Sequence, residues 1–228
     1  MSVKRDCLFL VADGAMGSVV DGFLSKGHLE GRLGCRQFEF DFDEDVLESP
    51  RLGLGADGGI HKHCHRMLQE NGYMETHEKL VVMCDQQFGS ERPAEEVRNE
   101  ILEALRRNGW GDCRADVVVI DPELEVWIWQ DSPHVEQVLG YSGAGSLRDE
   151  LKHGGEWPEG NDKPCHPKEL IQQLCRKYRT PYSSAIYREI SELVSVKQCK
   201  DPAFQQLVAT LRFWFPRSGR NYEKMGCY

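Results

Sequence analysis

The sequence predicts an α/β fold, in which a mainly parallel sheet is flanked by helices and followed by a C-terminal helical segment. Three short apolar runs, at residues 7–13, 80–85 and 117–121, each end on an aspartate. Runs this short and this rich in valine and leucine are typical of strands buried on both faces. Segments of helical length separate the runs, which indicates right-handed crossovers between parallel strands.

In the first half of the chain, strands and helices are expected to alternate. Residues 14–24 and 94–108 repeat apolar side chains at helical spacing, and residues 60–71 form a helix closed by glycine. Residues 35–42 alternate polar and aromatic side chains, which favours a half-exposed edge strand. Between this strand and the helix at 60–71, the glycine- and aspartate-rich residues 43–59 are predicted to form an irregular loop that covers the functional site.

The second half is predicted to be mainly helical. Residues 124–129 are short and mixed, and either extend the sheet or open a helix. A short helix at 146–152 precedes three longer ones, which begin near Pro167, Ser183 and Asp201, where proline or a capping side chain suits the first turn. We expect a single domain, with an α/β core at 1–140 and a helical extension at 141–228 packed on it.

The aspartates that follow the strands are the first candidate site. The carboxyl ends of parallel strands meet at one edge of a sheet, so Asp13, Asp85 and Asp121 are expected to lie near one another. Clustered carboxylates repel, and usually share a hard cation such as Mg2+. The alternative is that each aspartate starts a turn or caps a helix.

The segment Asp121-Pro122-Glu123-Leu124-Glu125 is the densest acidic motif beside a strand end. In an extended backbone, Glu123 and Glu125 point to the same side. With Asp13 and Asp85 they form a set that suits one or two Mg2+ ions, which would clamp the oxygens of a phosphoryl transfer. The alternative is that these carboxylates accept backbone N–H groups within a loop.

A second candidate site is the histidine cluster around residues 61–65. His61 and His65 have the i, i+4 spacing used by zinc sites, and His77 is the nearest further ligand in sequence. A solvated helix face is the preferred interpretation, so zinc at His61 and His65 is not expected.

Composition limits the partners. A net charge of −9 over 228 residues argues against free affinity for nucleic acid. However, residues 163–228 carry 12 Lys and Arg against 5 Asp and Glu, so this basic region offers a face for nucleic acid or an acidic partner. No apolar stretch is long enough to span a membrane, and residues 1–6 leave no room for a secretory signal. With nine cysteines expected to be reduced, a cytoplasmic location follows.

Several segments, taken in order, resemble the fourth component of the bacterial methylation-associated defence system, a multigene anti-phage locus. They include Leu8 to Asp13, Asn108 to Asp112, Asp121 to Trp129, Asp131 to Val135, Pro167-Lys168-Glu169, Ser183 to Tyr187 and Cys199 to Phe204. The Pro-Glu-Leu-Glu and Ser-Ser-Ala-Ile-Tyr segments are the most specific. This resemblance implies a component of a defence system that works with the other proteins of the locus.

The layout is distantly similar to Toprim-like families, including overcoming-lysogenization nucleases. Toprim domains bind Mg2+ for DNA strand chemistry through a glutamate after the first strand and an Asp-x-Asp after a later one, so the resemblance implies a Mg2+-dependent nuclease. Our first hypothesis for this chain is that Asp13, Asp85 and Glu123 bind metal, Glu125 supports the metal site, and Lys163 or Lys168 contacts phosphate. The chain departs from the Toprim pattern, because Asp13 stands for a glutamate and Asp85-Gln86-Gln87 lacks the second carboxylate of Asp-x-Asp. The alternative is a catalytically inactive adaptor or sensor that binds another protein of the system.

Overall fold

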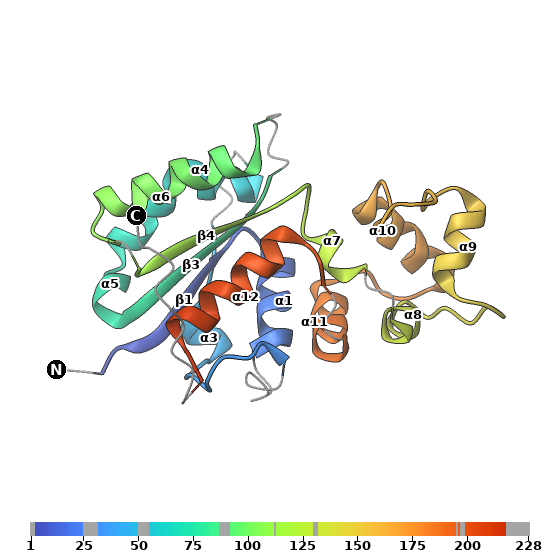
Figure 1. Ribbon diagram of the computed structural model, residues 1–228, viewed down its shortest axis with the longest axis horizontal. Helices are drawn as coiled ribbons and strands as arrows, with labels where there is room; N and C mark the ends of the chain where they lie inside the picture. Colours follow the sequence, from blue (N-terminus) through green and yellow to red (C-terminus); the bar gives the residue numbers. More distant parts are fainter. Residues whose placement is uncertain are drawn as a thin grey trace.

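The computed structural model describes residues 3–24, 32–49, 55–86, 92–111, 113–129, 132–194, 196 and 199–217, without the side chains of 55–58. Its centre is a parallel sheet of four strands in the order β2-β1-β3-β4 (Figure 1). The strands are β1 (Arg5–Val11), β2 (Val46–Glu48), β3 (His77–Asp85) and β4 (Ala115–Ile120). The predicted α/β class and the three predicted strands are confirmed.

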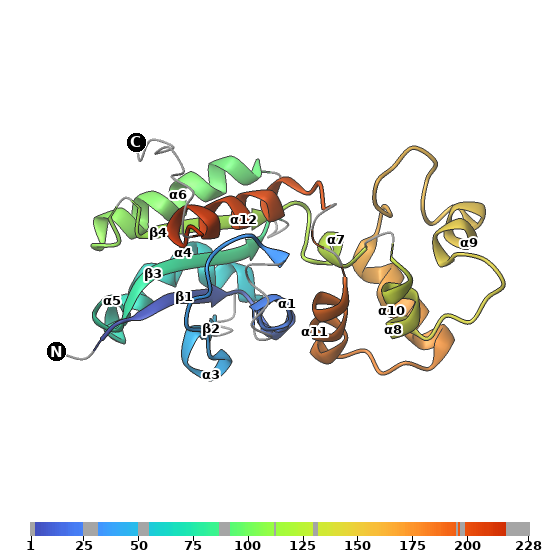
Figure 2. The same ribbon diagram turned by 60° about the horizontal axis from the view of Figure 1, so that its bottom comes forward.

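Helices cover both faces of the sheet. One face carries α4 (Gly55–Glu70), α5 (Tyr73–Thr76) and α6 (Ala94–Arg107), and the other carries α1 (Gly14–Leu24) and α12 (Pro202–Trp214) (Figures 1 and 2). The central strands are therefore shielded from solvent, and Phe9, Val81 and Val118 are fully buried. This double coverage explains why the strands consist of continuous apolar runs.

The sequence prediction fails between residues 35 and 49. Residues 36–40 pair with no strand of the described sheet, and the edge strand is β2, which lies inside the predicted loop after the short helix α3 (Phe42–Asp45). The alternating aromatic residues instead anchor an extended segment by packing, since Phe40 contacts Phe9 edge-on and Phe38 stacks on Phe215. Of the predicted loop, residues 50–54 lie outside the described part of the chain.

The chain leaves the sheet after β4 and later returns to it. The intervening helices are α7 (Glu125–Ile128), α8 (Pro133–Leu139), α9 (Leu147–Gly154), α10 (Pro167–Tyr178) and α11 (Ser184–Leu193). Helices α8, α9 and α10 extend to one side, whereas α11 packs against α1 and α12 against β4 (Figure 2). Residues 124–129 thus form one helical turn and do not extend the sheet.

Two further expectations concern cysteines and membranes. Seven of the nine cysteines are free thiols, six of them buried, but Cys113 is disulfide-bonded, so the expectation of nine reduced thiols is wrong at this position. Within the described ranges, no helix combines the length and apolarity that crossing a membrane requires.

Candidate functional site

Every strand of the sheet ends at or just before an acidic residue. Asp13 follows β1, Glu48 ends β2, Asp85 ends β3, and Asp121 follows β4. In the register of the sheet, Val11 pairs with both Glu48 and Met83, so these carboxylates lie along one edge. The predicted convergence of acidic side chains at the carboxyl edge therefore has a basis in the strand register.

Asp13 begins helix α1. Its Oδ1 accepts hydrogen bonds from the backbone N–H groups of Ala15 and Met16, both at 3.0 Å. These are two of the backbone donors that the first turn of a helix leaves without a partner. Asp13 therefore has the capping role that the sequence left open as its alternative.

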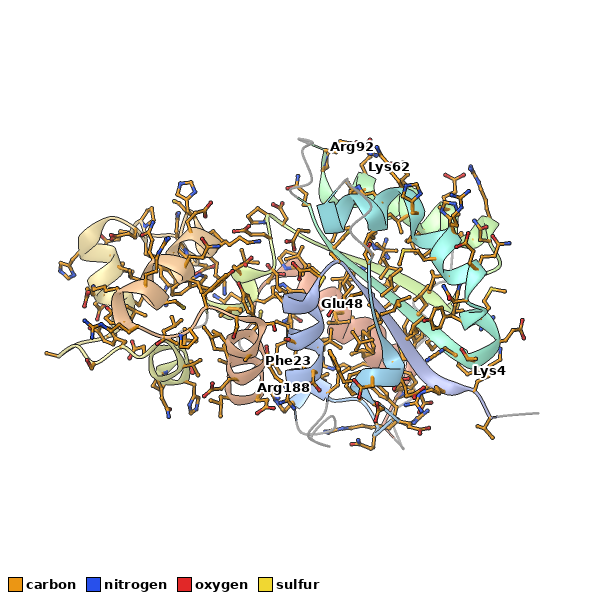
Figure 3. The ribbon with its side chains drawn as sticks, turned by 180° about the vertical axis from the view of Figure 1, so that it is seen from behind. Lys4, Phe23, Glu48, Lys62, Arg92 and Arg188 are labelled. Atoms are coloured by element: carbon orange, nitrogen blue, oxygen red, sulfur yellow. The ribbon has the colours of Figure 1, made fainter. Side chains whose placement is uncertain are left out.

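Glu48 stands beside the same helix start, and sequence reasoning missed it. A Cβ on Gly14 would lie 3.1 Å from Glu48 Oε1, so the carboxylate rests against the first turn of α1 (Figure 3). The positive end of the helix dipole favours a carboxylate there. The only sequence signal is the pair Val46-Leu47 before an acidic residue, which is too short to identify a strand.

Three of the predicted site residues meet around Lys168. Asp85 Oδ1 accepts the backbone N–H of Leu124 at 2.9 Å, which holds the start of α7 against the end of β3. Glu123 Oε1 accepts the backbone N–H of Lys168 at 3.1 Å, and Lys168 Nζ lies 3.7 Å from Glu125 Oε1. Burial works against the charge of Lys168, but Glu125, Glu123 and Asp85 outweigh it and raise the pKa of its ammonium group.

Glu125 is the most enclosed member of this cluster. Its side chain is 2% exposed, and its Oε1 accepts the hydroxyl of Tyr187 at 2.7 Å. Tyr187 in turn lies 2.9 Å from the hydroxyl of Tyr182, which is at the surface. The other oxygen of Glu125, Oε2, is buried and has no hydrogen-bond partner in the described part of the chain.

This environment changes the acidity of the neighbouring groups. Burial raises the pKa of Glu123, and the nearby Glu125 carboxylate raises it further. Burial, the charge of Glu125 and the bond to Tyr182 raise the pKa of Tyr187. Both causes favour the protonated form of Glu123 over its ionised form.

Lys163, the other predicted phosphate contact, has a different environment. Its Nζ donates to the carbonyl oxygen of Trp129, and burial lowers its pKa. Lys163 thus anchors the segment before α10, and its role in phosphate binding stays a prediction.

The histidine cluster lies on α4, on the helical layer away from α1 and α12 (Figure 1). His61 is half-buried, and burial lowers its pKa. His77, the suggested additional ligand, bonds to Asp45 through Nε2 and to Thr76 through Nδ1. Because both ring nitrogens of His77 are engaged at the start of β3, this residue does not complete a zinc site in this arrangement.

Among the residues that the structure describes, no three His, Cys, Asp or Glu side chains are arranged to hold a metal ion. The oxygen donors of Asp13, Asp85 and Glu123 suit a hard cation in kind. In the arrangement seen here, the positive charge among the carboxylates is supplied by Lys168.

Comparison with known proteins adds no family. No protein-family model matches the chain, and no curated protein or solved structure matches it either. The site therefore has to be interpreted from its own geometry.

Proposed function

We propose that this protein is a Mg2+-dependent phosphoryl-transfer protein of the nuclease type, acting as a component of a bacterial anti-phage defence system. The observation that carries the proposal is the meeting of Asp85, Glu123 and Glu125 around Lys168. It brings together three segments that underlie the sequence resemblance, Asp121 to Trp129, Pro167-Lys168-Glu169 and Ser183 to Tyr187.

The chain's own residues have distinct roles in this proposal. Lys168 would contact a non-bridging phosphate oxygen, for which a charged ammonium group is suited. Glu123, which accepts the backbone N–H of Lys168, would act as a carboxylate ligand of the metal ion. Glu125 would keep Lys168 charged and in place, and Tyr187 would fix the orientation of Glu125.

Two features support a metal ion here: the oxygen donors suit a hard cation in kind, and Oε2 of Glu125 is buried without a partner among the described residues. Asp13, Asp85 and Glu123 would hold Mg2+, with Glu48 nearby. When bound, the ion would stabilise the negative charge that develops on the transferred phosphoryl group.

The test is calorimetric titration of Mn2+ into the metal-free protein and into the double variant Asp13→Asn/Asp85→Asn. Asparagine retains the capping oxygen at position 13, so the variant should stay folded while losing carboxylate ligands. We expect saturable binding that weakens about tenfold or more in the variant. Asp149→Asn changes an exposed carboxylate of α9 and serves as the control.

Cleavage of plasmid and single-stranded DNA should follow the same pattern, and Lys168→Ala should reduce cleavage without abolishing Mn2+ binding. A wild-type protein that binds no Mn2+ would contradict the metal-dependent proposal.

A second function is favoured by one observation. Asp13, Asp85, Glu123 and Glu125 each bond to another part of the protein, as in a site that stabilises structure. This favours a non-catalytic adaptor or sensor that binds another protein of the defence system. Co-purification of an intact complex by the wild type and by Lys168→Ala alike, without any metal requirement, would support this function over the first.

A further inference from the structure

Strand β4 is an edge of the described sheet, and half of its backbone groups face away from β3. The N–H of Leu80 donates to the carbonyl of Arg114, and that of Gln86 donates to the carbonyl of Ile120. Backbone groups alternate in direction along a parallel strand, so the even-numbered residues of β4 bond to β3. Val117 and Val119 therefore direct their N–H and C=O groups toward the open edge.

Side chains cover this edge at Val117. Its N–H donates to Asp116 Oδ1 at 2.8 Å, and its carbonyl accepts from Arg98 Nε at 3.1 Å and Gln206 Nε2 at 2.8 Å. Arg98 and Gln206 come from α6 and α12, on opposite faces of the sheet. Such cover is one way in which proteins prevent a foreign strand from pairing with an edge.

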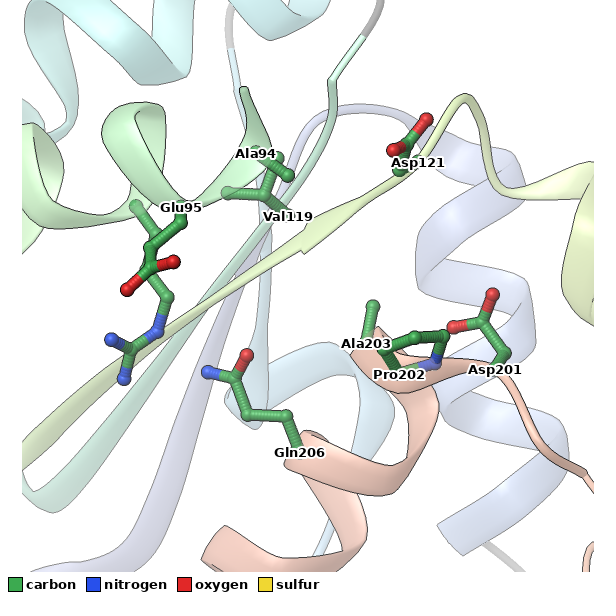
Figure 4. Close-up of a pocket in the computed structure, with 9 residues that line it drawn as sticks. Ala94, Glu95, Val119, Asp121, Asp201, Pro202, Ala203 and Gln206 are labelled. Carbon is green, nitrogen blue, oxygen red and sulfur yellow. The ribbon is translucent and has the colours of Figure 1, made fainter.

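Two residues further along β4, this cover gives way to a cleft. The cleft has a volume of about 510 Å³, and Val119 lines it together with residues of α6 and α12. Figure 4 shows Val119 between Ala94 of α6 and Ala203 of α12. The outward backbone groups of Val119 thus lie in a space of the size that proteins use to bind small molecules and short peptide segments.

The cleft carries negative charge from three elements. Glu95 lies in the first turn of α6, Asp121 follows β4, and Asp201 caps α12 (Figure 4). The carboxylates of Glu95 and Asp121 have no ion-pair or hydrogen-bond partner among the described residues. Asp201 is fixed in place, because its Oδ1 accepts from the backbone N–H of Phe204 and from Trp127 Nε1.

The positive group in the lining is already neutralised. Arg98 Nη2 lies 2.7 Å from Oδ1 of Asp116, a buried residue with 6% of its surface exposed. Among the described residues that line the cleft, the remaining charge is therefore that of the three carboxylates, which disfavours phosphate and nucleic acid and favours a basic group.

We propose that this cleft binds an extended peptide segment of a partner protein, with a lysine or arginine side chain directed at Glu95, Asp121 or Asp201. The segment adds backbone hydrogen bonds to Val119, as in recognition by strand addition. The carboxylates select a basic side chain, and the cover at Val117 limits the pairing to a short stretch. This proposal stands apart from the metal chemistry, and gives the adaptor function a defined partner chemistry.

The experiment is a titration of the 15N-labelled full chain followed by NMR, in the presence of EDTA so that metal binding plays no part. The probe is the capped peptide Thr-Val-Arg-Val-Arg-Thr, compared with Thr-Val-Glu-Val-Glu-Thr and with the basic peptide N-methylated on its two central amides. We expect saturable shifts of the Val119 amide with the basic peptide and no such shifts with the acidic peptide. N-methylation should weaken binding about tenfold, since it removes backbone hydrogen bonds.

Charge reversal tests the location. Glu95→Lys/Asp121→Lys should weaken binding of the basic peptide by about tenfold or more, because each exposed ion pair contributes up to about fivefold and the reversal adds repulsion. Glu103→Lys/Asp149→Lys makes the same change of net charge at exposed positions outside the cleft, and should leave binding unchanged.

Four results of the peptide titrations would overturn the proposal. They are the absence of a saturable Val119 shift at about 2 mM basic peptide, equal binding of the acidic peptide, equal binding of the N-methylated peptide, and equal binding by the charge-reversed variant. Equal shifts with 1,5-diaminopentane would also overturn it, because the cleft would then be a site for a free amine and not for a strand.

Discussion

Glu125 is a buried charge whose retention depends on two neighbours. Removing a carboxylate from water is costly unless hydrogen bonds and an opposite charge replace the lost hydration. Tyr187 supplies the hydrogen bond and Lys168 the charge, and both come from helices far along the chain from α7. The cluster therefore connects α7, α10 and α11 at one point.

Replacing Tyr187 with phenylalanine should destabilise the protein. The change leaves Glu125 without its hydroxyl donor, and a buried acceptor without a partner costs about 1–3 kcal/mol. Tyr182→Phe is the matched control, because Tyr182 is 43% exposed and water can take the place of its hydroxyl. Equal losses in urea denaturation of the two variants would show that Glu125 does not depend on Tyr187.

The site residues differ in how far the sequence could predict them. Asp85 ends β3 and Glu123 comes shortly after β4, and the ends of strands can be located from apolar runs. The partner of Glu125 could not be predicted, because Tyr187 lies 62 positions away and its contact depends on how α11 packs. Glu48 was missed because β2 has only three residues.

At the scale of elements, α1 and α11 approach closely through a glycine. A Cβ on Gly22 would lie 2.5 Å from the carbonyl oxygen of Arg188 and 2.7 Å from Ser191 Cβ. Both neighbours belong to α11, and the ion pair between Asp21 and Arg188 spans the same contact. Gly22 thus sets the distance between the two helices.

Gly22→Ala should destabilise the protein by about 1–3 kcal/mol, because overpacking outweighs the better helix propensity of alanine. Gly17→Ala is the control in the same helix, since its Cβ would lie 3.4 Å from Val46 Cγ1, at ordinary contact distance. That variant should be unchanged or more stable by up to about 1 kcal/mol. A thermal unfolding series in which both variants behave alike would contradict this view of the α1–α11 contact.

The elements that could be predicted well are those whose apolar pattern follows directly from burial, on both faces for the central strands and on one face for an amphipathic helix. The strands at 80–85 and 117–121 and the amphipathic helix α6 are of this kind. The prediction of an edge strand at 35–42 was wrong. Alternating aromatic residues also occur where an extended segment outside the sheet packs its rings on the core, as Phe38 and Phe40 do.

At the scale of the whole molecule, the last described helix, α12, covers part of one face of the sheet, far along the chain from the strands. The face of α12 that contains Phe204, Leu207 and Leu211 is buried, and Phe204 meets Phe23 of α1 and Trp127 of α7. The predicted division into a core at 1–140 and an extension at 141–228 therefore separates the sheet from α12, one of the helices that cover it.

A fragment of residues 1–140 should lack native tertiary structure. Each large apolar side chain buried by α12 contributes about 1.5–3 kcal/mol, and together they approach the whole stability of a typical domain, about 5–15 kcal/mol. Near-UV circular dichroism and NMR dispersion provide the measurement. A full chain with a protease site at the exposed Gly160, cut after folding, is the control and should stay folded.

Because α12 lies near the end of the described chain, it is synthesised long after the sheet that it covers. A ribosome delivers β4 more than 80 residues before α12. During that interval the growing chain presents the apolar surface that Phe204 and Leu207 later cover, and such surface attracts chaperones and other nascent chains. The cellular yield of this protein should therefore depend on how quickly the segment from 121 to 201 is translated.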